Sequence, residues 1–289
     1  MSTARRFGMS TMNGTAVLVT GGSRGIGAAT AVRLAREGAD VAFTYVRDEA
    51  RAAEVAARIE AAGRKALPLR ADAADPGDAA GAVAWAADAL GRLDVLVNNA
   101  GIGVLGPLAS LSPADVDRVL AVNVRAVFLA SQAAAGRLPD GGRIVTIGSC
   151  MTQRVPGPGA TLYTMSKTAL TGLTKALARE LGGRGITANL VHPGPVDTDM
   201  NPADGPLAPG QTPLTALGRF GTPDEVASMV AFLAGPGQPE PARHGPAVGE
   251  GAAEAACRGP RPWGGPVRAD AERLAAAVPL AGAGVLRQP

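Results

Sequence analysis

The sequence has few of the residues that bind metals, form disulfides or build hydrolytic triads. Its 289 residues include only two cysteines, Cys150 and Cys257, and two histidines, His192 and His244. Two cysteines make no disulfide framework, and the four side chains show no metal-ligand spacing. With only two histidines, a catalytic Ser-His-Asp triad is also not expected. We therefore expect no metal site, and we expect the protein to work in a reducing cytoplasm.

Long apolar runs and blocks of like charge are missing as well. The apolar stretches are strand-sized, which predicts that no segment spans a membrane. The net charge is only +3 and the arginines are scattered, so neither a nucleic-acid surface nor a basic membrane-binding helix is expected. Residues 1–12 contain two arginines but not the apolar stretch of a signal peptide, and we expect a flexible N-terminus there.

Residues 13–234 do contain a regular alternation of strand-like and helix-like segments. Apolar runs typical of buried strands cover 16–20, 41–45, 65–72, 93–99, 143–149 and 186–194, of which 65–72 is the weakest. Ala-rich segments of helical length lie at 26–37, 49–62, 78–90, 113–136, 162–182 and 223–234. Apolar strands that alternate with helices indicate a parallel sheet covered on both faces. Right-handed crossovers then give a single α/β domain, a doubly wound Rossmann fold.

Residues 235–289 differ in composition from the rest of the chain. They hold 10 Gly and 9 Pro among 55 positions, with almost no strand-forming run. Such a segment has little apolar surface to offset its ordering entropy. We expect a mostly disordered tail with one short helix near 269–278.

A glycine-rich turn follows the first predicted strand directly and leads into a helix. Its pattern, at residues 21–27, is Gly-x-x-x-Gly-x-Gly. Glycines permit a tight turn and a close approach of the backbone to a pyrophosphate, which the N-terminus of the following helix stabilises. A turn of this kind between a strand and a helix indicates a dinucleotide site. Its predicted contacts are Gly21, Ser23, Arg24, Gly25, Ile26 and Gly27.

The charge at the end of the second predicted strand indicates which dinucleotide binds. An NAD site carries an Asp or Glu there for the ribose 2′-hydroxyl. This chain has Tyr45, followed by Arg47, and Arg24 lies in the glycine turn. Two guanidiniums favour a 2′-phosphate, and hence NADP(H) over NAD(H). The alternative is that either arginine is merely solvated, and the acidic Asp48 and Glu49 also follow closely.

Tyr163 and Lys167 carry the candidate chemistry. The chain has only two tyrosines and three lysines, and these two are spaced i, i+4 in a predicted helix, which puts them on one face. A tyrosine ordinarily has a pKa of about 10 and transfers protons poorly at neutral pH. A lysine one turn away is expected to stabilise the phenolate and lower that pKa toward the working range.

Together these elements resemble the single-domain short-chain dehydrogenase/reductase family, over roughly residues 12–234. The matching motifs, in order, are TGGSRGIG (20–27), Asp72 after the third strand, NNAG (98–101), Asn123, Ser149, YTMSK (163–167) and HPGPVDT (192–198). Extended family members space their glycines as TGxxGxxG and match less well. The resemblance implies a Rossmann fold and hydride transfer between a nicotinamide and a carbonyl carbon.

The resemblance also implies a role for each matching residue. Tyr163 would protonate the carbonyl oxygen, Ser149 would polarise that oxygen, and Lys167 would hold the nicotinamide ribose. Asn123 would hold a water that links Lys167 to solvent. His192 is expected to be structural, since the useful feature is the bend that follows it. The family resemblance implies further contacts with the cofactor, at Asp72, Ala73, Asn99, Ala100, Gly101, Pro193, Gly194, Val196 and Thr198.

The substrate is less well determined. Residues 199–215 form a Pro/Gly-rich polar loop, placed as a substrate lid. The resemblance is greatest to 3-oxoacyl-thioester reductases, including those that act on acyl carrier protein, but a ketone of secondary metabolism fits equally. The expected enzyme is a homo-oligomer, a tetramer or dimer, that reduces a small-molecule carbonyl substrate.

The C-terminus departs from the family pattern. After the last predicted helix, members continue into a strand of pattern TGxxLxVDGG, whereas this chain continues with GPGQPEPARHGP. Such an abrupt change suggests a reading-frame shift in GC-rich coding DNA, a hypothesis that an intact frame on resequencing would contradict. Without that strand, the alternative function is a dinucleotide-binding protein with weak or no catalysis.

Overall fold

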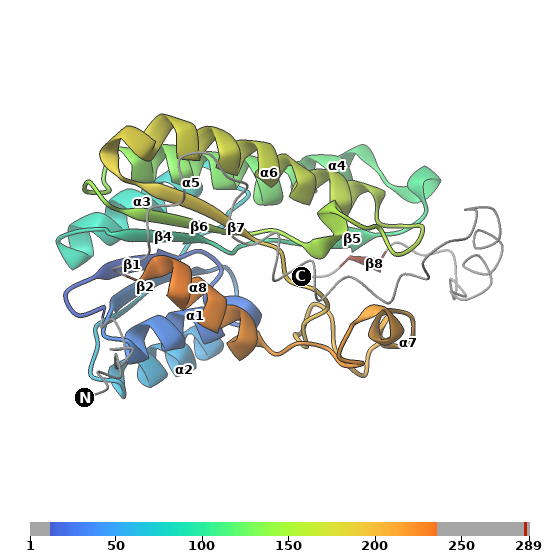
Figure 1. Cartoon of the computed structure of the whole chain (residues 1–289), viewed down its shortest axis with the longest axis horizontal. Helices are drawn as coiled ribbons and strands as arrows, with labels where there is room; N and C mark the ends of the chain where they lie inside the picture. Colours follow the sequence, from blue (N-terminus) through green and yellow to red (C-terminus); the bar gives the residue numbers. More distant parts are fainter. Residues whose placement is uncertain (1–11, 236–285, 288–289) are drawn as a thin grey trace, which may run out of the picture.

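A computed structural model of the chain describes residues 12–235 and 286–287. At its centre is a parallel sheet with the strand order β3-β2-β1-β4-β6-β7 (Figure 1). The order reverses between β1 and β4, where a doubly wound sheet opens a crevice for ligands. This confirms the predicted Rossmann fold. The strands are β1 (Ala16–Val19), β2 (Asp40–Tyr45), β3 (Ala66–Arg70), β4 (Val95–Asn98), β6 (Arg143–Ile147) and β7 (Thr187–Val191).

Helices cover both faces of the sheet (Figure 1). On one face lie α1 (Gly25–Arg36), α2 (Glu49–Glu60) and α8 (Pro223–Ala234). On the other lie α3 (Pro76–Leu90), α4 (Pro113–Leu120), α5 (Ala126–Ala135) and α6 (Thr161–Leu181). Every residue of β1 and β4 is buried, because both faces of these central strands contact helices. That burial explains why their sequences are continuously apolar.

The sequence itself marks several helix starts. Asp75 caps α3, accepting hydrogen bonds from Gly77 N at 2.7 Å and Asp78 N at 3.0 Å. Ser112 and Thr222 begin α4 and α8 with capping boxes, each followed by a proline in the first turn. These local signals agree with the apolar pattern and fix where the helices start.

The predicted helix at 113–136 is interrupted. A π-helical turn, η2 (Ala121–Arg125), separates α4 from α5. Short one-turn elements appear at η1 (Leu108–Ser110), η3 (Cys150–Thr152), η4 (Gly182–Arg184), α7 (Ala208–Gln211) and η5 (Thr212–Leu214). π-Turns inside helices occur frequently at functional sites.

A second, two-stranded sheet was not predicted. β5 (Val104–Leu105) pairs antiparallel with β8 (Leu286–Arg287), which belongs to the segment expected to be mostly disordered. The short helix predicted near 269–278 lies outside the described residues. Within the described ranges the main sheet ends at β7, which pairs only with β6.

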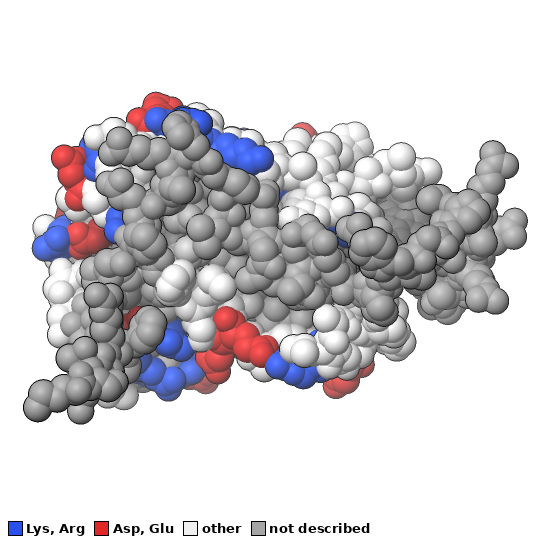
Figure 2. Space-filling view, in the orientation of Figure 1, with Lys and Arg blue, Asp and Glu red and all other residues white. Residues whose placement is uncertain are grey.

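The described part of the chain contains no helix long and apolar enough to cross a bilayer. It also contains no group of three His, Cys, Asp or Glu side chains that could hold a metal ion. Where Figure 2 shows charged side chains of the described residues, mainly around the edge of the view, basic and acidic groups lie side by side.

Candidate active site

A cleft of about 850 Å³ lies at the carboxyl ends of the strands. The glycine loop and the end of β2 line one part of it, and α6 with the segments after β6 and β7 lines the rest. All predicted site residues except Asn123 line this cleft. They are Gly21, Ser23, Arg24, Gly25, Ile26, Gly27, Tyr45, Arg47, Asp72, Ala73, Asn99, Ala100, Gly101, Ser149, Tyr163, Lys167, Pro193, Gly194, Val196 and Thr198.

The glycine loop approaches its neighbours so closely that side chains would not fit. Gly21 has a φ of +66°, and a Cβ on it would lie 3.0 Å from Ala100 Cα. A Cβ on Gly22 would lie 2.6 Å from the Phe43 Cβ, and one on Gly27 would lie 2.2 Å from the Gly21 carbonyl oxygen. The loop therefore requires glycine, both for its backbone angles and for packing.

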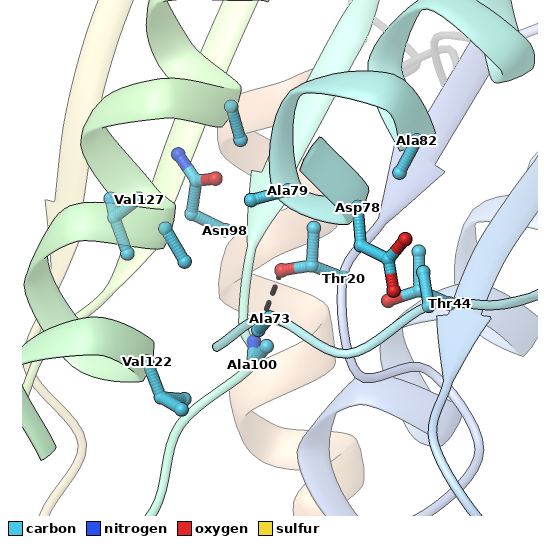
Figure 3. A pocket seen from close by; sticks show the side chains of 13 residues that line it. Thr20, Thr44, Ala73, Asp78, Ala79, Ala82, Asn98, Ala100, Val122 and Val127 are labelled. Carbon is cyan, nitrogen blue, oxygen red and sulfur yellow. Dashed lines mark hydrogen bonds between the residues drawn. The ribbon is translucent and has the colours of Figure 1, made fainter. Parts of the chain in front are cut away.

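Two threonine hydroxyls hold this loop in place. Thr20 Oγ1 accepts a hydrogen bond from Asn99 N at 3.0 Å. It also accepts one from Ala100 N at 3.1 Å, which Figure 3 shows as a dashed line. Thr44 Oγ1 accepts one from Gly21 N at 2.9 Å. Both line a second cavity, with room for about one water, between the sheet, α3 and α5. Neither threonine is among the cofactor contacts predicted from the sequence, although Thr20 begins the TGGSRGIG motif, because no local pattern indicates that a hydroxyl at a strand end holds the loop.

The N-terminus of α1 can bind an anion. Arg24, its N-cap residue, is extended and makes no side-chain cap hydrogen bond, whereas α2, α3, α4 and α8 are each capped by an Asp, Ser or Thr. The first-turn amides of this 12-residue helix therefore face the cleft without a side-chain acceptor. Together with the glycine cradle, they fit a dinucleotide pyrophosphate.

The end of β2 determines which ribose fits. Tyr45 is half-buried and Arg47 is exposed, and both line the cleft with Arg24. The Asp48 carboxylate, a candidate partner for a 2′-hydroxyl, is already engaged. It caps α2 by accepting from Arg51 N at 2.9 Å and pairs with Arg51 Nε at 3.3 Å. This geometry favours the prediction that Arg24 and Arg47 bind the 2′-phosphate of NADP(H).

Asp72 follows β3 at the cleft wall. One of its carboxylate oxygens accepts from Ala74 N at 2.9 Å, and the other lies 3.3 Å from Arg118 Nη1 of α4. Arg118 also lines the cleft. No sequence motif points to it, because only the fold brings it to Asp72.

Tyr163 and Lys167 lie one turn apart on α6, as predicted. Lys167 is 5% exposed, and its Nζ donates to the Ile147 carbonyl oxygen at 2.9 Å. A Cβ on Gly101 would lie 3.3 Å from Lys167 Nζ and 3.4 Å from Asn123 Oδ1. The ammonium and the Asn123 amide therefore converge on the backbone at Gly101.

The expected lowering of the Tyr163 pKa by Lys167 is not found. Burial raises the pKa of Tyr163, and the Ser149 hydroxyl lowers it in part. Burial also lowers the pKa of Lys167 from 10.5 to about 8. The prediction was wrong because it considered only the charge of the lysine and not the cost of burying either charged form.

Ser149 is held by His192. The His192 Nδ1 lies 2.9 Å from Ser149 O, 3.3 Å from Ser149 N and 3.3 Å from Thr152 Oγ1. A Cβ on Gly148 would lie 2.7 Å from the same nitrogen. His192 is buried, and it contacts both polar backbone groups of the residue predicted to polarise the substrate. The sequence suggested only a structural role and did not indicate which residue His192 supports.

Asn123 lies in the π-turn and is fully buried. Its Oδ1 accepts from Ile102 N at 2.9 Å, and its Nδ2 donates to Ile102 O and to Ser166 Oγ, both at 3.0 Å. The side chain therefore ties α6 to the strand-end loop after β4. It supports the site from behind the cleft wall.

The far end of the cleft is lined by several apolar side chains. The loop at 199–215 contains α7 and is closed on itself by a hydrogen bond from Asn201 Nδ2 to Gln211 Oε1 at 2.8 Å. No sequence motif points to this apolar lining, which comes from the loop and from the segments after β4 and β6. It consists of Val104, Leu105, Met151, Met200, Leu207 and Leu214.

Comparisons with known proteins found similar sequences and similar structures. A family model described as Enoyl-(Acyl carrier protein) reductase matches residues 21–239. A protein of Escherichia coli K12, the cyclic-di-GMP-binding biofilm dispersal mediator protein, is 46% identical over 228 residues, covering 79% of this chain and 92% of its own.

Two solved structures are also similar. A short-chain dehydrogenase from Burkholderia cenocepacia, in complex with NADP, is 56% identical with a TM-score of 0.77. A blue fluorescent protein from a metagenomic library, in complex with NADPH, is 53% identical with a TM-score of 0.77. Each match covers 78% of this chain and 92% of the other. With the glycine loop and the Ser149, Tyr163 and Lys167 set at one cleft, these matches show that the chain belongs to the short-chain dehydrogenase/reductase family.

Proposed function

We propose that this oxidoreductase reduces a ketone to a secondary alcohol with NADPH, and that Tyr163 is the general acid. The observation that supports this most is the shared cleft. Ser149, Tyr163 and Lys167 line the same cavity as the glycine loop and the arginines at the end of β2. A pure binding site would not require a hydroxyl, a phenol and a buried amine in addition to the dinucleotide cradle.

The cofactor would be held by residues whose geometry fits its parts. The glycine cradle and the uncapped N-terminus of α1 suit the pyrophosphate. Arg24 and Arg47 suit a 2′-phosphate, since guanidiniums bind phosphate oxygens in pairs. When bound, NADPH supplies the hydride that reduces the carbonyl carbon.

The side chains of the protein then stabilise and protonate the carbonyl oxygen. As hydride reaches carbon, negative charge develops on oxygen, and the Ser149 hydroxyl donates a hydrogen bond to it. Tyr163 transfers its proton to that oxygen, which completes the alcohol and leaves a phenolate. Lys167 lies one turn from Tyr163 on α6 and, as the family resemblance implies, would hold the nicotinamide ribose.

The substrate class follows from the apolar far end of the cleft. Val104, Leu105, Leu207 and Leu214 provide an apolar wall suited to an acyl chain or a hydrophobic ring. A 3-oxoacyl thioester or a ketone of secondary metabolism would place its carbonyl at Tyr163 and its apolar part against this wall. A panel of such ketones, followed by NADPH consumption, tests the choice.

Fluorescence titration of NADPH and NADH with wild-type protein and a Tyr163→Phe variant tests the function itself. We expect tight NADPH binding, weaker NADH binding, the same affinities in the variant, and ketone reduction by wild type alone. Reduction by the variant at the wild-type rate would contradict the role of Tyr163.

A second candidate is a dinucleotide-binding protein with weak or no catalysis. The name of the E. coli relative supports it, because that protein is described by its binding of cyclic di-GMP. The end of the described sheet at β7, where the family pattern has one more strand, also supports it. Displacement of NADPH by cyclic di-GMP, with no turnover of any ketone in the panel, would favour this function over the first.

A further inference from the structure

An acidic side chain of the substrate loop contacts two arginines beside the cofactor end of the cleft. The Asp199 carboxylate accepts a hydrogen bond from Arg51 Nη1 of α2. The same oxygen lies 3.9 Å from Arg24 Nη1, at the start of α1. Asp199 directly follows Thr198, whose side chain lies beside the glycine loop, 3.4 Å from where a Cβ on Gly25 would be. The substrate loop is therefore tied to the arginines by its first residue.

This arrangement is an anion site that the chain's own carboxylate fills. Two guanidiniums from different helices meet one carboxylate, and Asp199 and Arg24 both line the cleft. The side chains are between 39% and 47% exposed, so an incoming anion can reach them. Asp48, 3.3 Å from Arg51 Nε, is the other carboxylate paired with Arg51.

We propose that Asp199 competes with the 2′-phosphate of the cofactor for Arg24 and Arg51, so that phosphate binding releases the substrate loop. This inference rests on the proposed NADP(H) function. A phosphomonoester carries more charge than a carboxylate and offers three strong acceptor oxygens. Guanidiniums bind phosphate with paired hydrogen bonds, whereas exposed carboxylate pairs are weak. The phosphate therefore displaces Asp199, and Arg51 becomes a specificity residue that the β2 pattern did not reveal.

The consequence is a link between cofactor choice and the substrate site. The loop that begins at Asp199 carries Leu207 and Leu214 into the apolar end of the cleft. When the arginines bind phosphate, the tether on that loop is lost, and the loop is free to rearrange around a substrate. A dinucleotide without the phosphate leaves the tether in place.

Fragment binding to the full chain tests this without any turnover. Adenosine 2′,5′-bisphosphate and 5′-AMP are titrated calorimetrically into wild type, Asp199→Asn, Arg51→Gln and Asp204→Asn. Asp204 is an exposed carboxylate of the same loop, so its variant controls for the lost charge. We expect Asp199→Asn to bind the bisphosphate about two- to fivefold more tightly, the size of one exposed ion pair, with 5′-AMP unchanged. Arg51→Gln should bind the bisphosphate more weakly, again with 5′-AMP unchanged.

Hydrogen exchange over residues 200–215 provides the second readout. We expect faster exchange in wild type once the bisphosphate is bound, and fast exchange in Asp199→Asn with or without it. If wild type binds the two fragments equally well, the NADP(H) function itself fails. If wild type prefers the bisphosphate but Asp199→Asn binds it no more tightly than Asp204→Asn does, the competition is overturned and the NADP(H) function stands.

Discussion

At the scale of single residues, burial controls the chemistry of this site. Tyr163 and Lys167 are neighbours on α6, yet the pKa of Tyr163 is raised and that of Lys167 is lowered. Both shifts favour the neutral forms, so the resting site holds a protonated phenol. A protonated phenol is the form that a reductase needs, because the carbonyl oxygen must receive a proton.

Replacement of Tyr163 by Phe removes that proton and little else. We expect the rate of ketone reduction to fall by about 10²- to 10⁴-fold, the usual contribution of a general acid. NADPH affinity and thermal stability should stay near wild type, since the ring is retained. Steady-state kinetics measures the rate of ketone reduction, and fluorescence titration measures the NADPH affinity. A large loss of NADPH binding would instead indicate a structural role.

Lys167 should make stability depend on pH. Its folded-state pKa of about 8 lies below its ordinary value of 10.5, so between these values the unfolded chain binds more protons. Stability should therefore rise with pH across this window, by on the order of 3 kcal/mol for this group, and be lost as pH falls through 8. Urea unfolding of wild type and Lys167→Met from pH 7 to pH 10.5 isolates the effect, and parallel curves would contradict it.

His192 should act through Ser149. In His192→Ala, the backbone groups of Ser149 lose a partner, so we expect a lower kcat, an unchanged NADPH affinity and a stability loss of about 1–3 kcal/mol. His192→Asn, whose amide can reach the same groups, should restore much of the rate. Equal rates in the Ala variant and wild type would show that His192 does not position Ser149.

At the scale of elements, tight contacts fix the strand-to-helix turn between β1 and α1. The loop passes so close to Ala100 and Phe43 that a Cβ on Gly21 or Gly22 would meet them, and Gly25, Ile26 and Gly27 at the start of α1 line the cleft. Since the loop contacts β2 and the end of β4, a change in any of these segments would move the pyrophosphate cradle.

A pair of glycine variants tests this element. In Gly27→Ala the new methyl would meet the Gly21 carbonyl, so we expect a loss of about 1–3 kcal/mol and of NADPH binding. In Gly172→Ala, on an exposed position of α6 with no atom within 4 Å, we expect a gain of about 0.5–1 kcal/mol and unchanged binding. Thermal unfolding with and without NADPH measures the stability and the NADPH binding of both variants. If both variants change stability and binding equally, the tight packing at Gly27 is not what makes glycine necessary there.

The elements also show what can be predicted from sequence. Apolar runs predicted the six main strands, most weakly β3, whose residues are only partly buried or exposed. The glycine turn predicted the cofactor cleft, because both patterns are local. The π-turn at 121–125 was not predicted. A single π-helical turn inside a helix hardly changes the helical spacing of the apolar residues, so the sequence pattern resembles that of one uninterrupted helix. The contacts of Arg118 with Asp72 and of Arg51 with Asp199 were not predicted either, because they join distant segments that only the fold brings together.

At the scale of the whole molecule, we propose that the protein is a homo-oligomer. Apolar side chains remain exposed on neighbouring helices of one face, where Phe128 of α5 and Met165 of α6 are each 49% exposed. Light scattering should give a dimer or tetramer of the 28.8 kDa chain. Replacement of Phe128 by Glu should lower that mass if this face is an interface. A monodisperse monomer would contradict the inference.

The pairing of β5 with β8 has a practical consequence for anyone who expresses the protein. Val104 and Leu105 of β5 line the apolar end of the cleft, and β8 ends only two residues before the C-terminus. An affinity tag fused after β8 would be tethered close to Val104 and Leu105, two residues of the cleft lining. Met12 N, by contrast, donates to Glu37 O at the end of α1 away from the glycine loop. A purification handle therefore belongs on the N-terminal side, and kinetic data from C-terminally tagged protein would report partly on the tag.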